Sequence, residues 1–112
     1  MNHSGYLYLA LAILSEVAGT IALKFSNGFQ KLLPSSITVV GYALAFYLLS
    51  LSLKTLGVGF TYAVWAGIGI VLISIAGVFV FGEKVDLGGI IGLGLIVAGV
   101  VILNLYSGMG KG

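Results

Sequence analysis

Charged residues divide this chain into long uncharged stretches. Between Lys31 and Lys54 lie 22 uncharged residues. Another 28 separate Lys54 from Glu83, and the stretch from Asp86 to Lys111 holds 24. About 20 apolar residues are enough for an α-helix to cross the hydrocarbon core of a bilayer. Each stretch is therefore long enough for one transmembrane helix.

A fourth apolar stretch runs from about Gly5 to Leu23 and is interrupted only by Glu16. We interpret it as a retained helix rather than a signal peptide, because it has no basic leading region, contains a carboxylate and is followed by Lys24 instead of a small-residue cleavage site. The sequence predicts one four-helix transmembrane domain over residues 1–112. Its predicted spans are about 5–23, 35–53, 58–81 and 87–106.

Composition supports an all-α protein surrounded by lipid. Hydrophobic residues make up 60% of the chain and charged residues 7%, against about 25% charged residues in an average soluble domain. The spans lack the apolar–polar alternation of a membrane β-barrel. The basic balance comes from five lysines at or near helix ends, which indicates membrane flanks rather than binding to nucleic acid.

Neither a metal site nor an enzyme active site is predicted. The chain has no cysteine, which excludes disulfides and cysteine-based metal sites. Neither a phosphate-binding glycine loop nor a nucleophile constellation occurs, and the sequence predicts no cofactor.

The lysines are nearly balanced between the two sides of the membrane. Three of them, Lys24, Lys31 and Lys84, fall on one side, and Lys54 and Lys111 fall on the other. Lysine and arginine asymmetry normally sets orientation, so this balance favours dual topology, with two copies inserted in opposite directions. The alternative is a single orientation selected by other factors.

Four short helices enclose too little volume for a substrate pathway of their own. We therefore expect a homodimer, which is antiparallel if topology is dual. Gly92 and Gly99 lie on one face of the fourth span, and small residues on one stripe let helices approach closely in lipid. Glycine is also simply common in membrane helices, so a role in dimer packing is one of two interpretations.

Glu16 is the principal candidate for function. It lies about 3 Å from the middle of the first span at 1.5 Å rise per residue. A carboxylate there is costly and by default marks a functional site, so we predict that Glu16 binds protons and a cationic substrate. The structural alternative is a protonated side chain that bridges helices. Residues predicted to share its face and leave room for substrate include Leu9, Ala12, Ile13 and Thr20.

Aromatic residues form the second constellation. Tyr42 and Phe46 are one turn apart in the second span, and Tyr62 and Trp65 share a face of the third. Aromatic faces attract cations, which predicts a substrate pocket lined by these four residues. The alternative for Tyr62 and Trp65 is an interfacial aromatic belt.

The third span and the loop after it each hold one further group of residues. Gly67 and Gly69 could form a hinge in the third span, or could serve close packing. Glu83, Lys84 and Asp86 are interpreted as a solvated loop cluster.

Taken together and in order, these residues resemble the small multidrug resistance family over essentially the whole chain. The motifs that carry the resemblance are Ser15-Glu-Val-Ala-Gly-Thr20, Lys24-Phe-Ser26, Gly28-Phe29, Pro34-Ser35, Tyr42, Tyr62-Ala-Val-Trp-Ala-Gly-Ile-Gly69, Ala98-Gly-Val100 and Asn104.

The resemblance implies an antiparallel homodimer in the bacterial inner membrane, with transport driven by the proton gradient. It implies that protons and substrate bind the two copies of Glu16 in mutually exclusive fashion, that Tyr42, Tyr62 and Trp65 line the pocket, and that Gly67 and Gly69 form a hinge. Position 66 is Ala, where many relatives carry a hydroxyl residue that bonds the glutamate.

The expected function is proton-coupled export of lipophilic, aromatic and quaternary ammonium cations. Tyr42 and the run from Glu16 to Thr20 resemble the quaternary ammonium branch of the family. An exporter of guanidinium-type cations is the alternative within the family. A proton-binding rotor subunit or a small structural membrane protein is the alternative from another class.

Overall fold

The chain forms four α-helices in a computed structural model that describes residues 4–108. The helices are α1 (Ser4–Phe25), α2 (Leu32–Ser52), α3 (Val58–Phe81) and α4 (Leu87–Tyr106). All four are long and apolar enough to span a membrane, and the described residues contain no strand. The predicted all-α class with four spans is confirmed. Lys111, one of the lysines counted above, lies outside the described residues.

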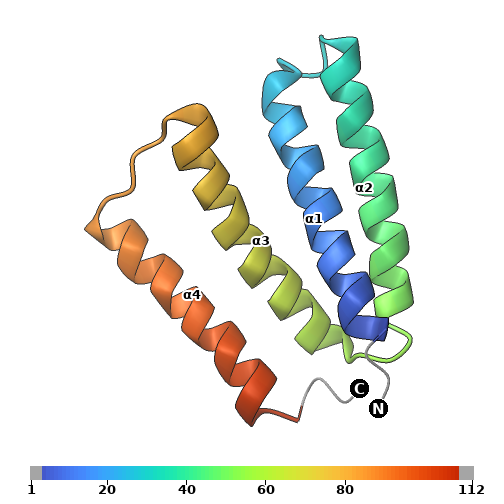
Figure 1. The fold of residues 1–112 in the computed structure, drawn as a ribbon, viewed down its shortest axis with the longest axis vertical. Helices are drawn as coiled ribbons and strands as arrows, with labels where there is room; N and C mark the ends of the chain where they lie inside the picture. The colour runs from blue at the N-terminus through green and yellow to red at the C-terminus, as the bar shows by residue number, and fades with distance from the viewer. Residues whose placement is uncertain (1–3, 109–112) are drawn as a thin grey trace. The chain divides into compact units, whose positions relative to one another are not determined.

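Two units make up the chain, Met1–Thr55 with α1 and α2, and Leu56–Gly112 with α3 and α4. Helices α1 and α2 pack against each other extensively, whereas α3 and α4 contact each other far less. Figure 1 shows α1 and α2 side by side and joined by a tight turn.

Ser26 organises the turn between α1 and α2. Its hydroxyl donates to the Leu23 carbonyl at 2.7 Å and accepts from the Phe29 backbone N–H at 3.1 Å. The side chain is fully buried. Three successive residues, Asn27, Gly28 and Phe29, have positive φ, the left-handed conformation that reverses a chain sharply. The turn thus fixes how α2 returns along α1.

Helix α2 begins at Leu32, three residues before the predicted start. Pro34 lies in its first turn, where the missing backbone N–H would have had no helical partner. The hydroxyls of Ser35 and Ser36 donate to the carbonyls of Lys31 and Leu32, four residues earlier. Such bonds satisfy polar side chains inside the helix itself, as lipid requires.

The α3–α4 unit is held at its loop by two helix caps. Gly82, at φ +68°, ends α3, and its N–H and that of Glu83 both reach the Gly77 carbonyl. Asp86 begins α4 by accepting a hydrogen bond from the Gly89 N–H at 2.8 Å. These caps confine the loop to a few residues.

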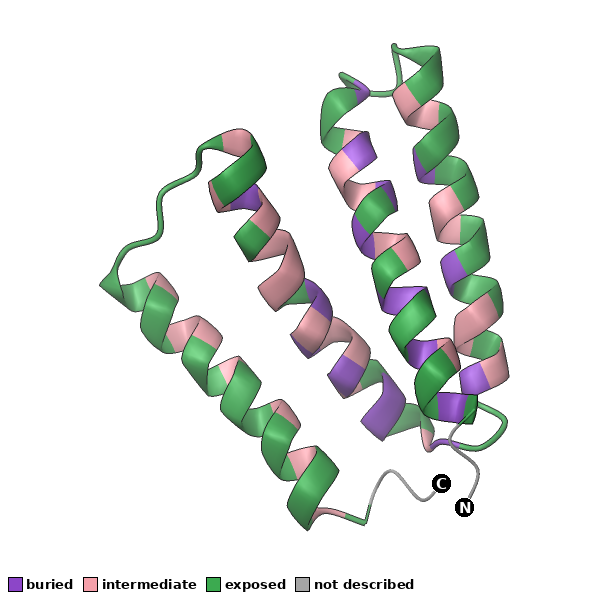
Figure 2. Cartoon of the chain, viewed as in Figure 1, coloured by how far each residue is buried: buried purple, intermediate pink, exposed green. Residues whose placement is uncertain are grey.

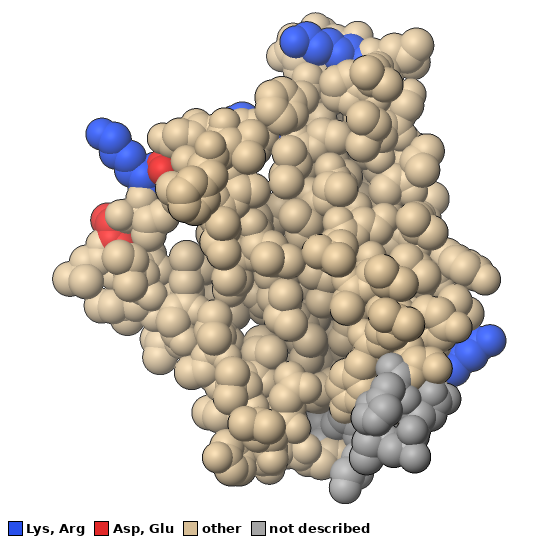
Figure 3. Space-filling view, in the orientation of Figure 1, with Lys and Arg blue, Asp and Glu red and all other residues tan. Residues whose placement is uncertain are grey.

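The surface of the chain is apolar in a way that suits lipid or a protein partner. Large hydrophobic side chains such as Leu32, Phe79 and Leu95 are mostly exposed. Helix α4 contains no buried residue among those described, and Figure 2 shows it without a buried patch. On the face in Figure 3, charged side chains lie at helix ends and loops, with uncharged residues between them.

Candidate functional site

Glu16 lies near the middle of α1 and is half-buried. It is the one acidic residue inside a helix among the described residues, since Glu83 and Asp86 belong to the loop before α4. Lysines Lys24 and Lys31 lie in the last turn of α1 and just before α2. The helix bounds therefore place the Glu16 carboxylate within an apolar helix, as the sequence predicts.

A chain of hydrogen bonds joins Glu16 to α2. The Thr20 hydroxyl, one turn along α1, donates to Glu16 Oε1 at 2.9 Å. The same Oγ1 lies 2.7 Å from Tyr42 Oη, and either hydroxyl could be the donor of that bond. Thr20 and Tyr42 are also half-buried. The carboxylate is thus connected through one hydroxyl to an aromatic residue of the neighbouring helix.

Two glycines bring α1 and α2 into close contact at this level. A Cβ at Gly19 would lie 3.0 and 3.1 Å from the Tyr42 ring carbons Cδ1 and Cε1, and 3.3 Å from the Thr38 carbonyl oxygen. A Cβ at Gly41 would lie 3.0 Å from the Ser15 carbonyl oxygen. Small residues at such crossings let helix backbones approach closely in lipid. The Tyr42 ring therefore lies against the backbone of the helix that carries Glu16.

Two hydroxyls fasten the same crossing. Ser15 Oγ donates across the helices to the Gly41 carbonyl at 2.8 Å. Thr38 Oγ1 donates to the Gly19 carbonyl at 2.9 Å and also reaches the Pro34 carbonyl at 3.1 Å. The sequence prediction gives no role to Ser15, Thr38 or Gly41. The available signal was that a hydroxyl residue and a glycine lie about one helical turn apart in each of the first two spans, Ser15 with Gly19 and Thr38 with Gly41.

The predicted pocket residues form two groups, one in each unit. In the first unit, Leu9, Ala12 and Ile13 are buried, with Thr20 and Tyr42 beside Glu16 as described. Phe46 is 58% exposed.

In the second unit, Tyr62 and Trp65 pack edge to face, with ring centroids 6.1 Å apart and an interplanar angle of 89°. Tyr62 is 65% exposed and Trp65 is half-buried. The quadrupoles of the two aromatic rings favour this edge-to-face geometry. The arrangement leaves much of the Tyr62 side chain accessible.

The predicted hinge glycines lie in a continuous helix. Helix α3 runs unbroken through Gly67 and Gly69, which are both buried. A Cβ at Gly67 would lie 2.6 Å from Val100 Cγ2 and 3.3 Å from Ile96 Cγ2, so Gly67 permits close contact between α3 and α4. In this conformation Gly67 serves packing, and bending at Gly67 and Gly69 stays a prediction.

The predicted packing glycines of α4 are open. A Cβ at Gly92 or Gly99 would meet no atom of the described residues outside its own stretch of α4 within 4 Å. Neither glycine is therefore needed for the packing of α4 against the described residues of α3.

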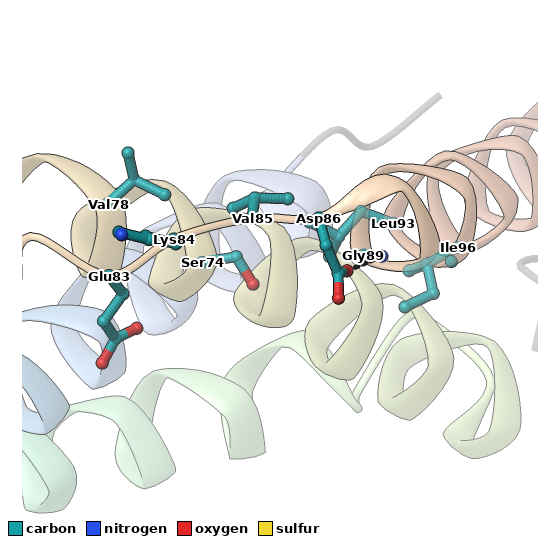
Figure 4. A pocket seen from close by; sticks show the side chains of 10 residues that line it. Ser74, Val78, Glu83, Lys84, Val85, Asp86, Gly89, Leu93 and Ile96 are labelled. Atoms are coloured by element: carbon teal, nitrogen blue, oxygen red, sulfur yellow. Dashed lines mark hydrogen bonds between the residues drawn. The ribbon is translucent and has the colours of Figure 1, made fainter.

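The loop before α4 borders an open groove of about 430 Å³ between α3 and α4. Glu83, Lys84 and Asp86 lie along it and are exposed (Figure 4). Asp86 is used as the cap of α4, and the Glu83 carboxylate folds against Gly77. These roles agree with the interpretation of the cluster as a solvated loop.

Comparison with known proteins assigns the family. The family model described as Small Multidrug Resistance protein matches residues 4–96, which include Glu16, Tyr42, Tyr62 and Trp65. The chain belongs to the small multidrug resistance family. The resemblance seen in the sequence is thereby confirmed.

Relatives within the family are similar over nearly their whole length. The quaternary ammonium compound-resistance protein QacE of Escherichia coli is 52% identical over 92% of this chain and 94% of its own. QacF of Klebsiella aerogenes, with the same description, is 53% identical over 91% and 93%. The multidrug transporter EmrE of Escherichia coli K12 is 50% identical over 91% and 93%.

Membership of the family fixes the broad nature of the protein. Its relatives are resistance proteins and transporters rather than enzymes. Four spanning helices in a family with these bacterial members make the chain a multi-pass protein of the bacterial inner membrane. The predicted localisation is confirmed.

Proposed function

We propose that this small multidrug resistance protein exports lipophilic and quaternary ammonium cations in exchange for protons, with cation and proton competing for Glu16. The observation that carries the proposal is the half-buried Glu16 carboxylate within α1, joined through Thr20 to the aromatic Tyr42. The names of the relatives, which refer to quaternary ammonium and multidrug resistance, support the substrate class.

The mechanism is competition for a single anionic site. A proton that reaches Glu16 removes the negative charge that holds a cation, and the cation leaves. Loss of the proton on the other side restores the charge. Tyr42, Phe46, Tyr62 and Trp65 contribute aromatic faces that attract cations without fixed hydrogen-bond geometry, which suits substrates of varied shape. The proton gradient supplies the energy, and no cofactor is required.

The transporting species in this proposal is an antiparallel homodimer. Helix α4 has no buried residue among those described, and Gly92 and Gly99 are open to close approach by another helix. The near balance of lysines allows insertion in both orientations. Two copies would bring two Glu16 side chains and two sets of aromatic residues to one transport pathway.

Ligand binding to detergent-purified protein tests the site and the substrate class together. We expect tetraphenylphosphonium to bind, to bind more weakly as the pH falls, and not to bind to the Glu16→Gln variant. Phe79→Leu, at an exposed position of α3, is the control variant and should bind as the parent does. If only guanidinium binds with this pH dependence, the chain exports compact cations instead. If neither binds, the exporter mechanism is wrong.

A further inference from the structure

Thr20 lies between the Glu16 carboxylate and the Tyr42 hydroxyl, which differ in whether they can donate a hydrogen bond. Its Oγ1 lies 2.9 Å from Glu16 Oε1 and 2.7 Å from Tyr42 Oη. A hydroxyl has one proton and two lone pairs, so Thr20 can donate to only one of these partners at a time. The direction of one hydrogen bond therefore constrains the direction of the other.

The protonation state of Glu16 selects between two directions. An ionised carboxylate can only accept, so Thr20 donates to Glu16 and Tyr42 must donate to Thr20. A carboxylic acid can itself donate. When Glu16 carries a proton, it can donate to Thr20, Thr20 can donate to Tyr42, and the Tyr42 proton turns to another acceptor. The oxygen atoms keep their places in both arrangements, and only the hydroxyl protons rotate.

The Thr20 hydroxyl departs from the usual behaviour of hydroxyls in these helices. Those of Ser35, Ser36 and Ser74 donate to the backbone carbonyl four residues earlier. Thr20 bonds the Glu16 side chain instead of the Glu16 carbonyl, and its second partner is also a side chain. Backbone bonding is the ordinary way for a helix to satisfy threonine, so a purely structural threonine at this position would not need either contact.

Packing holds the Tyr42 ring in place while its proton turns. The ring lies against the Gly19 backbone, and the Gly19 carbonyl is bonded by the buried Thr38 hydroxyl. On α2, the titratable side chain that takes part in these hydrogen bonds is Tyr42. The nearest titratable groups along α1 are Tyr8 and Lys24, each two turns from Glu16.

We propose that Thr20 is a positioning residue that transmits the protonation state of Glu16 to the hydroxyl of Tyr42. This inference rests on the proposed function. With Glu16 ionised, the Tyr42 proton is held by Thr20 and the remaining lone pair on its oxygen favours a cation beside the ring. With Glu16 protonated, the Tyr42 O–H turns away from Thr20. The positive end of its dipole then disfavours a cation beside the ring. Proton binding then weakens cation binding at two residues rather than one.

Tetraphenylphosphonium affinity at mildly basic and mildly acidic pH tests this coupling. The quantity of interest is the ratio of the two affinities. We expect Thr20→Val to reduce this ratio several-fold, because Tyr42 no longer responds to Glu16. Thr20→Ser, which keeps the hydroxyl, should restore the parent ratio. Tyr42→Phe should reduce the ratio by a similar factor, and the double variant Thr20→Val with Tyr42→Phe should reduce it no further.

A spectroscopic measurement reads the Tyr42 hydroxyl directly. In protein labelled with carbon-13 at the tyrosine Cζ, the Tyr42 signal is assigned by its loss in Tyr42→Phe. We expect it to shift with pH in the parent and in Thr20→Ser, and to stay fixed in Thr20→Val and in Glu16→Gln. Dimer size and helix content, measured on each variant, ensure that only folded protein is compared.

The outcomes separate this inference from the function on which it rests. If the parent binds the ligand without pH dependence, the proposed competition fails. If the parent is pH-dependent but Thr20→Val keeps the parent ratio and the parent shift of the Tyr42 signal, the relay alone is overturned. It is also overturned if Thr20→Ser is as defective as Thr20→Val, or if the Thr20 and Tyr42 effects multiply in the double variant.

Discussion

Gly41 lies where the backbones of α1 and α2 approach closely, and alanine at this position provides a sharp test of that contact. The added Cβ would lie 3.0 Å from the Ser15 carbonyl oxygen, 3.2 Å from Gly19 Cα and 3.3 Å from Gly19 N. All three neighbours are backbone atoms of α1. They cannot rotate away as a side chain would, so the two helices must separate by a few tenths of an ångström.

The expected cost follows from packing and hydrogen bonding. Overpacking a close contact costs about 1–3 kcal/mol, and separation lengthens the Ser15–Gly41 and Thr38–Gly19 hydrogen bonds, each contributing about 1 kcal/mol. Alanine offsets about 1 kcal/mol of this through its higher helix propensity. We expect Gly41→Ala to lower the free energy of unfolding by about 2 kcal/mol, the middle of the range that these figures give.

Unfolding by sodium dodecyl sulfate in mixed micelles, followed by circular dichroism, measures this difference. Gly94→Ala is the matched control, because a Cβ at Gly94 would meet nothing within 4 Å. Gly94→Ala should be as stable as the parent or slightly more stable. If Gly41→Ala and Gly94→Ala unfold at the same detergent concentration, the close α1–α2 approach described here is wrong.

Three other sets of substitutions test separate features of the protein. Asp86→Ala removes the N-cap of α4 and should lower stability by about 1 kcal/mol, while Asp86→Asn should preserve it, as thermal unfolding in detergent will show. Gly67→Ala places a methyl group against Val100 and should reduce transport of quaternary ammonium cations into vesicles, and the added change Val100→Ala should restore it. Failure of that rescue would contradict the α3–α4 contact. Gly92→Leu and Gly99→Leu should convert dimers to monomers on size exclusion without loss of helix content, and unchanged dimers would contradict the packing role of α4.

The four helices could be predicted from sequence because one physical rule governs them. Lipid requires about 20 apolar residues per span and rejects charge, so the spacing of lysines and acids delimits each helix. The predicted start of α2 lies three residues too late, because the predicted span leaves Pro34 outside the helix although proline is tolerated in the first turn. The dimer and its topology stay predictions.

The site was predictable in part. Glu16 stands out because a carboxylate within a span is costly, and Thr20 follows it at one helical turn. The partnership of Thr20 with Tyr42 could not be predicted, because it depends on the crossing of α1 and α2. That crossing is set by Gly19 and Gly41, and small residues carry little signal in a chain with 18 glycines. The substrate roles of the aromatic residues stay predictions.

Proton release on cation binding tests the central claim most directly. Purified protein is held in a weakly buffered, mildly acidic solution, and tetraphenylphosphonium is then added while the pH is recorded. We expect the solution to acidify in proportion to the cation bound, and Glu16→Gln to give neither binding nor acidification. Cation binding without release of protons would show that the two do not compete for Glu16.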